Sequence, residues 1–298
     1  MRVVIALGGN AFNQPGEPIR QDTHLRNVEV AAEVVARVAR EGNQVLVTHG
    51  NGPQVGFFAE LQREVNAFRL DALNAATQGL LGYFIVSAVD KRLGPGRAVA
   101  VFTRTEVDCD DPAFRNPTKF IGPSYSEAEA RGLAERYGWV FKQDPRGGYR
   151  RVVPSPAPLR IFELGAVKAL LESGFVVVAA GGGGVPICND GGVEAVVDKD
   201  LAASILAEQI GADLLVILTD VDAVYINYKK PNQKKLGTVR VGELEKYLLE
   251  GHFPPGSMGP KVEAAIRFVK STGKRAGIGA LEEGYEVYRG VAGTQVVP

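Results

Sequence analysis

The chain is poor in the side chains that usually bind metals or form cross-links. Its 298 residues include two cysteines and three histidines. Cys109 and Cys188 stand far apart and lack the CxxC spacing of a metal site. A chain of this length buries roughly 75% of its unfolded surface, so it needs neither disulfides nor a structural metal. We therefore expect both cysteines to be reduced, buried thiols, as is usual in a cytoplasmic protein.

An excess of charge and a long apolar segment are also missing. The chain has 34 Lys+Arg and 34 Asp+Glu, so its formal net charge is zero. This balance argues against nucleic acid or an anionic membrane as a partner. The start, MRVVIALGGN, does not have the pattern of a signal peptide. The most apolar later segment, residues 79–89, is shorter than the ~20 residues of a membrane span. We expect a cytoplasmic protein in which any attraction for phosphate is local.

Short apolar runs alternate with segments of helical period. Strands are predicted at residues 3–7, 45–48, 97–102, 175–180 and 214–218. Helices are predicted from about residue 25 to 42, and at 53–66, 163–173, 198–210 and 260–272. Such alternation predicts a parallel sheet covered by helices on both faces.

Residues 108–158 interrupt this alternation. The segment is rich in Pro and Gly, and it contains a hairpin pattern with strands at 139–142 and 149–153. The turn between them is Pro145-Arg146-Gly147-Gly148. We interpret the segment as a small lobe that projects over the sheet. The alternative is a surface excursion without function.

Three glycine clusters follow directly after predicted strands. They are Gly8-Gly9-Asn10, His49-Gly50-Asn51-Gly52 and Gly181-Gly182-Gly183-Gly184. The carboxyl ends of parallel strands meet at one edge of a sheet, where ligands bind. Glycine lets backbone N–H groups approach an anion there, and a following helix adds its positive end. For each cluster alone, a turn glycine is the alternative.

The usual nucleotide-binding fingerprints are missing. Neither GxxxxGK[ST] nor GxGxxG with an acidic ribose ligand occurs. This argues against a P-loop NTPase and against an NAD enzyme.

Two lysines stand at the predicted starts of helices. Lys199 lies between Asp198 and Asp200, and Lys261 follows Pro260, a residue tolerated in the first turn. A lysine at a helix N-terminus opposes the helix dipole, so each needs an anionic partner. A phosphate chain would supply one, and a solvated surface lysine is the alternative.

These segments together resemble the carbamate kinases, a branch of the amino acid kinase family. The resemblance runs along nearly the whole chain, and the PTK and VDKD motifs are more specific to carbamate kinases than the glycine loops. The matching motifs are ALGGNA at 6–11, HGNGPQVG at 49–56, PTKFIGP at 117–123, RRVVPSP at 150–156, GGGGVP at 181–186, GVEAVVDKDLAA at 192–203, LTDVDAVYINYKKPNQ at 218–233 and GSMGPKVEAA at 256–265.

The resemblance implies a three-layer α/β/α sandwich with a mainly parallel central sheet and a small protruding lobe. It implies one domain over residues 1–298. In that domain an N-terminal substrate lobe would span 1–210, with the protruding lid at 108–158, and a C-terminal nucleotide lobe would span 211–298. Similar enzymes are homodimers. They use Mg²⁺ with ATP or ADP to interconvert ATP plus carbamate with ADP plus carbamoyl phosphate.

Motif position also implies a role for individual residues. Lys119 should reach in from the lid, and Lys199 and Lys261 should clamp the transferring phosphoryl group while Asp200 orients them. The residues that should cradle carbamoyl phosphate are Gly8, Gly9, Asn10, Gly50, Asn51 and Gly52. Those on the nucleotide side should be Gly181, Gly182, Asp220, Tyr225 and Met258. No protein ligand to a metal is assigned.

The chemistry of carbamate removes the need for a general base. Carbamate presents an oxygen that is already ionised, whereas an alcohol must lose a proton to a placed side chain. We therefore expect His49, the histidine that lies in a motif, to order its loop. One rival is another small-acid kinase of the same family, acting on acetylglutamate or aspartate, whose substrates need extra polar contacts. The other is a non-catalytic nucleotide-binding protein on the same scaffold, which would not need lysines on both sides of a phosphate.

Residues 70–89 carry apolar side chains almost all round a helical wheel. Such a helix is too apolar for one side to face water, so a homodimer is predicted through it.

Overall fold

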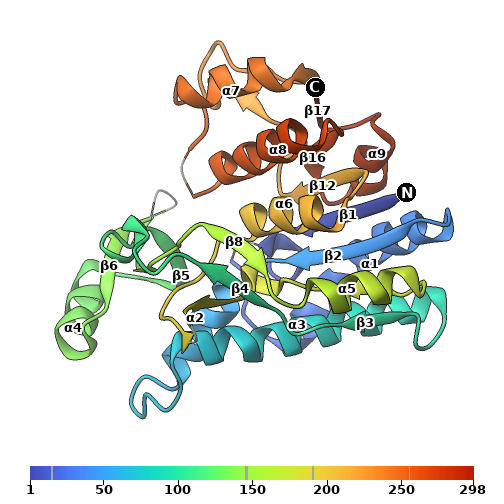
Figure 1. Cartoon of the computed structure of the whole chain (residues 1–298). Coiled ribbons are helices and arrows are strands. Elements are labelled where there is room, and N and C mark those ends of the chain that lie inside the picture. The colour runs from blue at the N-terminus through green and yellow to red at the C-terminus, as the bar shows by residue number, and fades with distance from the viewer. Residues whose placement is uncertain (15, 145–146, 190, 255) are drawn as a thin grey trace.

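The computed structural model describes residues 1–14, 16–144, 147–189, 191–254 and 256–298 (Figure 1). Its centre is an eight-stranded sheet in which neighbouring strands are parallel, except for the antiparallel pair β16 and β17. The order across the sheet is β15 (Thr238–Arg240), β17 (Thr294–Val297), β16 (Ala276–Ala280), β12 (Leu214–Thr219), β1 (Arg2–Leu7), β2 (Gln44–His49), β9 (Val176–Val178) and β3 (Ala98–Ala100). The mainly parallel sheet predicted from the sequence is confirmed.

Helices cover both faces of this sheet and make the three predicted layers. Alternate side chains of β1 point to opposite faces, as the strand period requires. Val3 and Ile5 pack with one set of helices and Val4 and Ala6 with the other, and all four are fully buried. The first set is α1 (Gln21–Arg40), α3 (Leu70–Leu93) and α9 (Gly284–Arg289), and the second is α5 (Leu164–Glu172), α6 (Lys199–Ile210) and α8 (Met258–Thr272).

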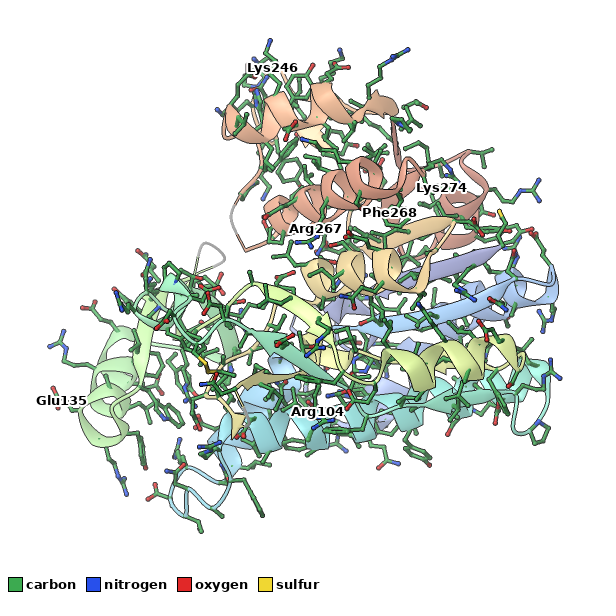
Figure 2. All side chains as sticks on the ribbon, in the orientation of Figure 1. Arg104, Glu135, Lys246, Arg267, Phe268 and Lys274 are labelled. Atoms are coloured by element: carbon green, nitrogen blue, oxygen red, sulfur yellow. A yellow bond between two sulfur atoms is a disulfide. The ribbon has the colours of Figure 1, made fainter. Side chains whose placement is uncertain are left out.

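Figure 2 shows the contrast between the core and the periphery. Phe268 of α8 is fully buried in the second helical layer, and burial of such a side chain contributes about 1.5–3 kcal/mol. Lys246 on α7 (Val241–Leu249) and Glu135 on the protruding lobe are exposed at two outer ends of the molecule.

The apolar segment at 79–89 is part of a longer helix, α3, than the sequence led us to expect. The helix runs for 24 residues, Leu70–Leu93, and by length and composition it could cross a membrane. More than half of its apolar window is nevertheless buried inside the fold, and it packs against α1 and β3. Contact with β3 is close, since a Cβ at Gly82 would lie 2.8 Å from Cβ of Ala100. The packing is that of a core helix.

Residues 119–153 form a small lobe, which is shorter than the segment 108–158 predicted for it. Strand β7 (Tyr149–Val153) pairs antiparallel with both β5 (Lys119–Tyr125) and β6 (Val140–Gln143), and α4 (Glu127–Tyr137) packs on them (Figure 1). The predicted hairpin is confirmed, although Pro145 and Arg146 of its turn lie outside the described residues. Helix α4 was not predicted. Its sequence signal is a capping box, in which Ser126 and Glu129 each bond the other's backbone N–H.

A second, four-stranded sheet carries the cysteines and overturns the expected free thiols. Its strand order is β11 (Gly191–Gly192), β10 (Val185–Cys188), β4 (Arg104–Val107) and β8 (Pro158–Ile161). Because β10 and β4 pair in parallel, their carboxyl ends lie side by side. Cys188 is the last residue of β10, and Cys109 follows β4 by two positions. Cys109 and Cys188 form a disulfide there, with Cα atoms 5.2 Å apart and 79 residues of sequence separation. Long-range strand pairing, invisible in the spacing, brings them together.

Candidate active site

The three glycine clusters lie together at the carboxyl edge of the main sheet. They follow β1, β2 and β9. The Gly8 N–H donates to the Leu218 carbonyl at 2.9 Å, and the Gly50 N–H donates to the Leu7 carbonyl at 3.1 Å. A cavity of ≈ 240 Å³ opens between these loops and the protruding lobe.

Position 182, in the third cluster, must be glycine for two reasons, its backbone conformation and the close approach of Asn51. Gly182 has a φ of +62°, and a Cβ there would lie 2.2 Å from Nδ2 of Asn51. That amide is held in place because it donates to Oγ1 of Thr77 at 2.8 Å and to Asn74. Asn51 and Gly182 thus fix the distance between two of the loops.

Three helices begin at the cavity. They are α2 (Gly52–Leu61), α6 and α8, whose first residues or N-caps line it. Within the described residues, neither Asn51 nor Ser257 caps its helix with a side chain, so first-turn N–H groups of α2 remain for a ligand. In α8 the Gly259 N–H already donates to the Pro254 carbonyl at 3.0 Å, and Pro260 has no N–H. Converging helix N-termini favour an anion in the cavity.

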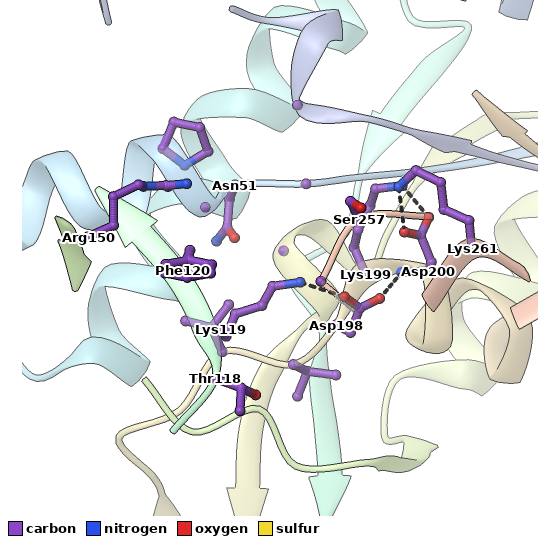
Figure 3. A pocket seen from close by; sticks show the side chains of 18 residues that line it. Asn51, Thr118, Lys119, Phe120, Arg150, Asp198, Lys199, Asp200, Ser257 and Lys261 are labelled. Carbon is purple, nitrogen blue, oxygen red and sulfur yellow. Dashed lines mark hydrogen bonds and ion pairs between the residues drawn. The ribbon is translucent and has the colours of Figure 1, made fainter. Parts of the chain in front are cut away.

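Two lysines share one carboxylate beside the cavity (Figure 3). The Nζ atom of Lys199 donates to Oδ1 of Asp200, and Nζ of Lys261 donates to Oδ2 of the same residue at 2.9 Å. Lys199 and Asp200 open α6, and Lys261 lies in the first turns of α8. All three side chains are at most 13% exposed. The anionic partner expected for each helix-start lysine is therefore Asp200 itself.

Burial and mutual attraction set the charges in this cluster. Burial alone would raise the pKa of Asp200, but Lys199 and Lys261 outweigh it and hold this pKa well below its usual range. Burial lowers the pKa of Lys199 to about 8 against the attraction of Asp200, with repulsion from Lys261 adding to the shift. For Lys261, burial is outweighed by Asp200, so its pKa is raised. At neutral pH the cluster carries one net positive charge.

The lobe contributes a third lysine. Lys119 opens β5, lines the cavity and lies with Nζ 2.5 Å from Oδ2 of Asp198. Contact between the lobe and the body is close next to it, because a Cβ on Gly56 of α2 would lie 1.9 Å from the Gly122 nitrogen of β5. The lysine therefore enters the site from a strand that packs directly on helix α2.

His49 is arranged as a structural side chain. Its ring is 1% exposed, packs edge-on against Phe12 at 5.5 Å, and contacts the Gly50 carbonyl through Nδ1 at 3.0 Å. Burial lowers its pKa to about 4, so it is neutral at neutral pH. Since a carbonyl can only accept, Nδ1 carries the proton.

Several of the predicted site residues line this cavity. They are Gly9, Gly50, Asn51, Gly52, Lys119, Gly182, Lys199, Asp200 and Lys261. Gly8, Asn10, Gly181, Asp220, Tyr225 and Met258 are not among the described lining residues. Of these, Asp220 is exposed, and the Tyr225 hydroxyl donates to Asp222 at 2.9 Å. Gly182, expected on the nucleotide side, lies with the residues expected to bind carbamoyl phosphate.

Sequence reasoning missed other lining residues. Asp198 and Arg150 are the charged ones, and both lie in quoted motifs, VDKD and RRVVPSP. Arg150 comes from β7, and it bonds Asp144 at 3.0 Å and the Gly122 carbonyl at 3.0 Å. The remaining ones are Pro53, Thr118, Phe120, Val196, Val197, Gly256 and Ser257.

Comparison with known proteins places the chain in a class. Residues 1–279 match the sequence profile of the amino acid kinase family. The chain belongs to the amino acid kinase family, and it is a kinase.

Within that family, the chain is similar over its full length to several carbamate kinases. The carbamate kinase of Pyrococcus horikoshii is 47% identical over 311 aligned positions, which cover 100% of this chain and 99% of the relative. Carbamate kinase from Giardia lamblia bound to AMP-PNP superposes with a TM-score of 0.90 at 41% identity, covering 99% of this chain and 98% of the other. The same enzyme bound to citric acid gives a TM-score of 0.93 at 40% identity, with the same coverage.

Proposed function

We propose that this kinase moves a phosphoryl group reversibly between ATP and carbamate, giving ADP and carbamoyl phosphate. The observation that carries the proposal is the pair of buried lysines on Asp200 beside a small cavity that also receives Lys119. The cavity, ≈ 240 Å³, is smaller than the roughly 300–1,000 Å³ of sites for drug-sized ligands, and it suits a compact anion. The names of the full-length relatives point the same way.

The lysines act as a charge clamp in this proposal. Phosphoryl transfer needs positioning and charge neutralisation more than covalent participation by the protein. Lys199 and Lys261 neutralise the transferring group, Asp200 holds both, and Lys119 approaches from the lid at 108–158. The backbone of Gly8, Gly9, Asn10, Gly50, Asn51 and Gly52 cradles carbamoyl phosphate.

No general base takes part. The buried, neutral imidazole of His49 uses Nδ1–H on the Gly50 carbonyl, and both oxygens of Asp200 face lysines. Carbamate needs no base, because its attacking oxygen is already ionised.

We assign the nucleotide to the C-terminal lobe at residues 211–298. Asp220, Tyr225 and Met258 bind it there. Gly181 and Gly182, which belong to the N-terminal lobe, contact its phosphates, which are directed at the cavity. The N-terminal substrate lobe is residues 1–210.

Mg²⁺ fits this arrangement as an ion carried by the nucleotide. Among the described residues, no group of three His, Cys, Asp or Glu side chains gathers to hold a metal. Proteins usually bind Mg²⁺ through one or two carboxylates together with substrate phosphates. Asp220 is an exposed carboxylate, and its negative charge helps to raise the pKa of Lys261. We therefore propose that Asp220 contacts the hydrated Mg²⁺ ion. When bound, the ion neutralises phosphate charge.

The working form is a homodimer in the cytoplasm. Helix α3 presents an outer row of apolar residues at helical spacing: Ala72, Ala76, Gly79 and Tyr83, the last 59% exposed. A second copy is the partner that would cover this row. Because the two cysteines form a disulfide, free thiols no longer support a cytoplasmic location. We base that location on the proposed small-molecule substrates instead.

A substrate panel tests the proposed function. The chain is given Mg²⁺ and ATP with carbamate, N-acetylglutamate or aspartate in turn, and ADP formation is measured. We expect ADP with carbamate alone. ADP formed with an amino acid substrate and not with carbamate would replace this function by another small-acid kinase. Nucleotide binding without ADP formation on any substrate would indicate a binding protein.

A further inference from the structure

The carboxylate of Asp198 accepts hydrogen bonds from two different parts of the fold. Its Oδ1 accepts from the backbone N–H of Asp200 at 2.8 Å and of Leu201 at 3.3 Å, which caps helix α6. Its Oδ2 accepts from Nζ of Lys119 at 2.5 Å (Figure 3). One carboxylate therefore joins the first residue of the lobe strand β5 to the first turn of the helix that carries Lys199 and Asp200.

The contact between Lys119 and Asp198 is sheltered from water. The Asp198 side chain is 11% exposed and that of Lys119 is 23% exposed. Burial would raise the pKa of Asp198, but Lys119 outweighs it and lowers this pKa, so Asp198 is ionised at neutral pH. Each oxygen of Asp200 already accepts from another lysine, and Asp198 is the carboxylate that Lys119 contacts.

We propose that Asp198 is a positioning residue, which holds the ammonium group of Lys119 at the cavity before the anionic substrate arrives. The inference rests on the proposed function and deepens it. Asp198 acts through Lys119. It holds the lobe in a fixed position against α6, so that Lys119, Lys199 and Lys261 meet at the same cavity. A preorganised donor needs no reorganisation during transfer, which is the source of its effect on rate.

The charges around the cavity predict that neutralising Asp198 affects kcat and KM differently. The three lysines and the two aspartates leave one net positive charge on this set. Neutralising Asp198 adds a second one, so attraction for an anionic substrate does not weaken, while Lys119 loses its anchor. The kcat should fall, and KM for carbamoyl phosphate should stay constant or fall.

A purely structural role is separated by the choice of variant. Asn caps helices about as well as Asp, so Asp198→Asn keeps the cap of α6 and removes the ion pair. Asp198→Ala removes both. Capping alone predicts that Asp198→Asn has wild-type kinetics and that Asp198→Ala has only a lowered Tm.

The test compares wild type, Asp198→Asn, Lys119→Ala and the double variant. Loss of one preorganised donor typically lowers the rate by ~10²- to 10³-fold, and misplacing Lys119 should cost at least about tenfold in kcat. Because Asp198 acts through Lys119, Asp198→Asn should have little further effect in the Lys119→Ala background. The inference would be overturned if the loss of kcat in the double variant equalled the product of the two single losses. A wild-type kcat in Asp198→Asn would also overturn it.

A second measurement does not depend on activity. The labelling rate of individual lysines by an amine-reactive reagent is read by mass spectrometry in wild type and in Asp198→Asn. Lys119 should label several-fold faster in the variant, whereas Lys142, on the same lobe and bonded to Asn116, should not change. Equal labelling of Lys119 in both proteins would contradict the inference even if the chain used another substrate. An unreactive wild type with altered Lys119 labelling would instead contradict only the proposed function.

Discussion

At the scale of single residues, one carboxylate determines the charge beside the cavity. Asp200 stays ionised because two ammonium groups outweigh its burial. The same carboxylate brings Lys199 and Lys261 together, although Asp200 and Lys261 are 61 positions apart in the sequence. Replacing any one of these three buried residues would leave a buried charge without its partner, so Asp200, Lys199 and Lys261 function as a unit.

The rate should depend on pH through Lys199. Because burial lowers its pKa to about 8, the free enzyme keeps this charge below pH 8 and loses it above. Initial-rate kcat/KM for carbamoyl phosphate should therefore decrease above that pH, approaching about tenfold per pH unit. Lys199→Arg keeps its charge throughout and should show a lower value without the alkaline decrease. A wild-type profile that is flat to about pH 10 would contradict this assignment.

Lys119 should matter for the anion and not for the nucleotide. Lys119→Ala is expected to lower kcat/KM for carbamoyl phosphate by about 10²-fold while the Kd for ADP changes little. Lys142→Ala on the same lobe is the matched control and should have wild-type kinetics. Steady-state kinetics with each substrate varied separately decide the matter. An equal loss for both substrates would point to misfolding of the lobe and remove the role of Lys119.

The residues that the sequence revealed are those with a local signal. Lys199 and Lys261 were found because a lysine at a helix start opposes the dipole. Asp198 was seen as part of the same motif, yet its bond to Lys119 spans 79 positions and depends on how the lobe packs. Arg150 was missed for the same reason, since only the antiparallel pairing of β7 with β5 brings it to the cavity.

At the scale of elements, predictions succeeded where one segment determines its own structure. The predicted strand at 214–218 is β12, Leu214–Thr219, and the predicted helix at 198–210 is α6, Lys199–Ile210. Elements that depend on partners were missed, such as β4 and β10, which form their own sheet. That sheet also explains why the cysteines were interpreted wrongly.

The disulfide should stabilise the fold. It closes a segment with 79 residues of separation, and removal of such a cross-link typically costs about 2–4 kcal/mol. A reductant should lower the Tm of wild type by several degrees, whereas the Cys109→Ser/Cys188→Ser double variant should start lower and not respond. Thermal unfolding with and without reductant checks this. Two free thiols per chain in unreduced, denatured protein would show that the disulfide does not form.

At the scale of the whole molecule, one sheet connects the three glycine loops that meet at the cavity. Strands β1, β2 and β9 carry the glycine loops, and β12 continues the same sheet toward residues 211–298. The lobe boundary proposed at residue 210 therefore divides an uninterrupted sheet, so the two halves should move as one body.

The outer face of α3 should join two copies. Light scattering at micromolar concentration should give twice the chain mass of 31.8 kDa. Tyr83→Glu places a charge in the row of exposed apolar residues and should give monomers. Leu249→Glu is the control, since Leu249 is 83% exposed on α7, away from this row. A wild-type monomer would leave α3 as a core helix only.

The central claim is that Lys199 and Lys261, held by Asp200, transfer a phosphoryl group between a nucleotide and carbamate. ATP formation from Mg²⁺, ADP and carbamoyl phosphate tests it most directly, with Lys199→Ala and Lys261→Ala measured beside wild type. We predict ATP from wild type, a kcat lowered by ~10²- to 10³-fold in each variant, and ADP binding retained in both. No ATP above a protein-free control, or an alanine variant that keeps more than about a tenth of wild-type turnover, would contradict the account.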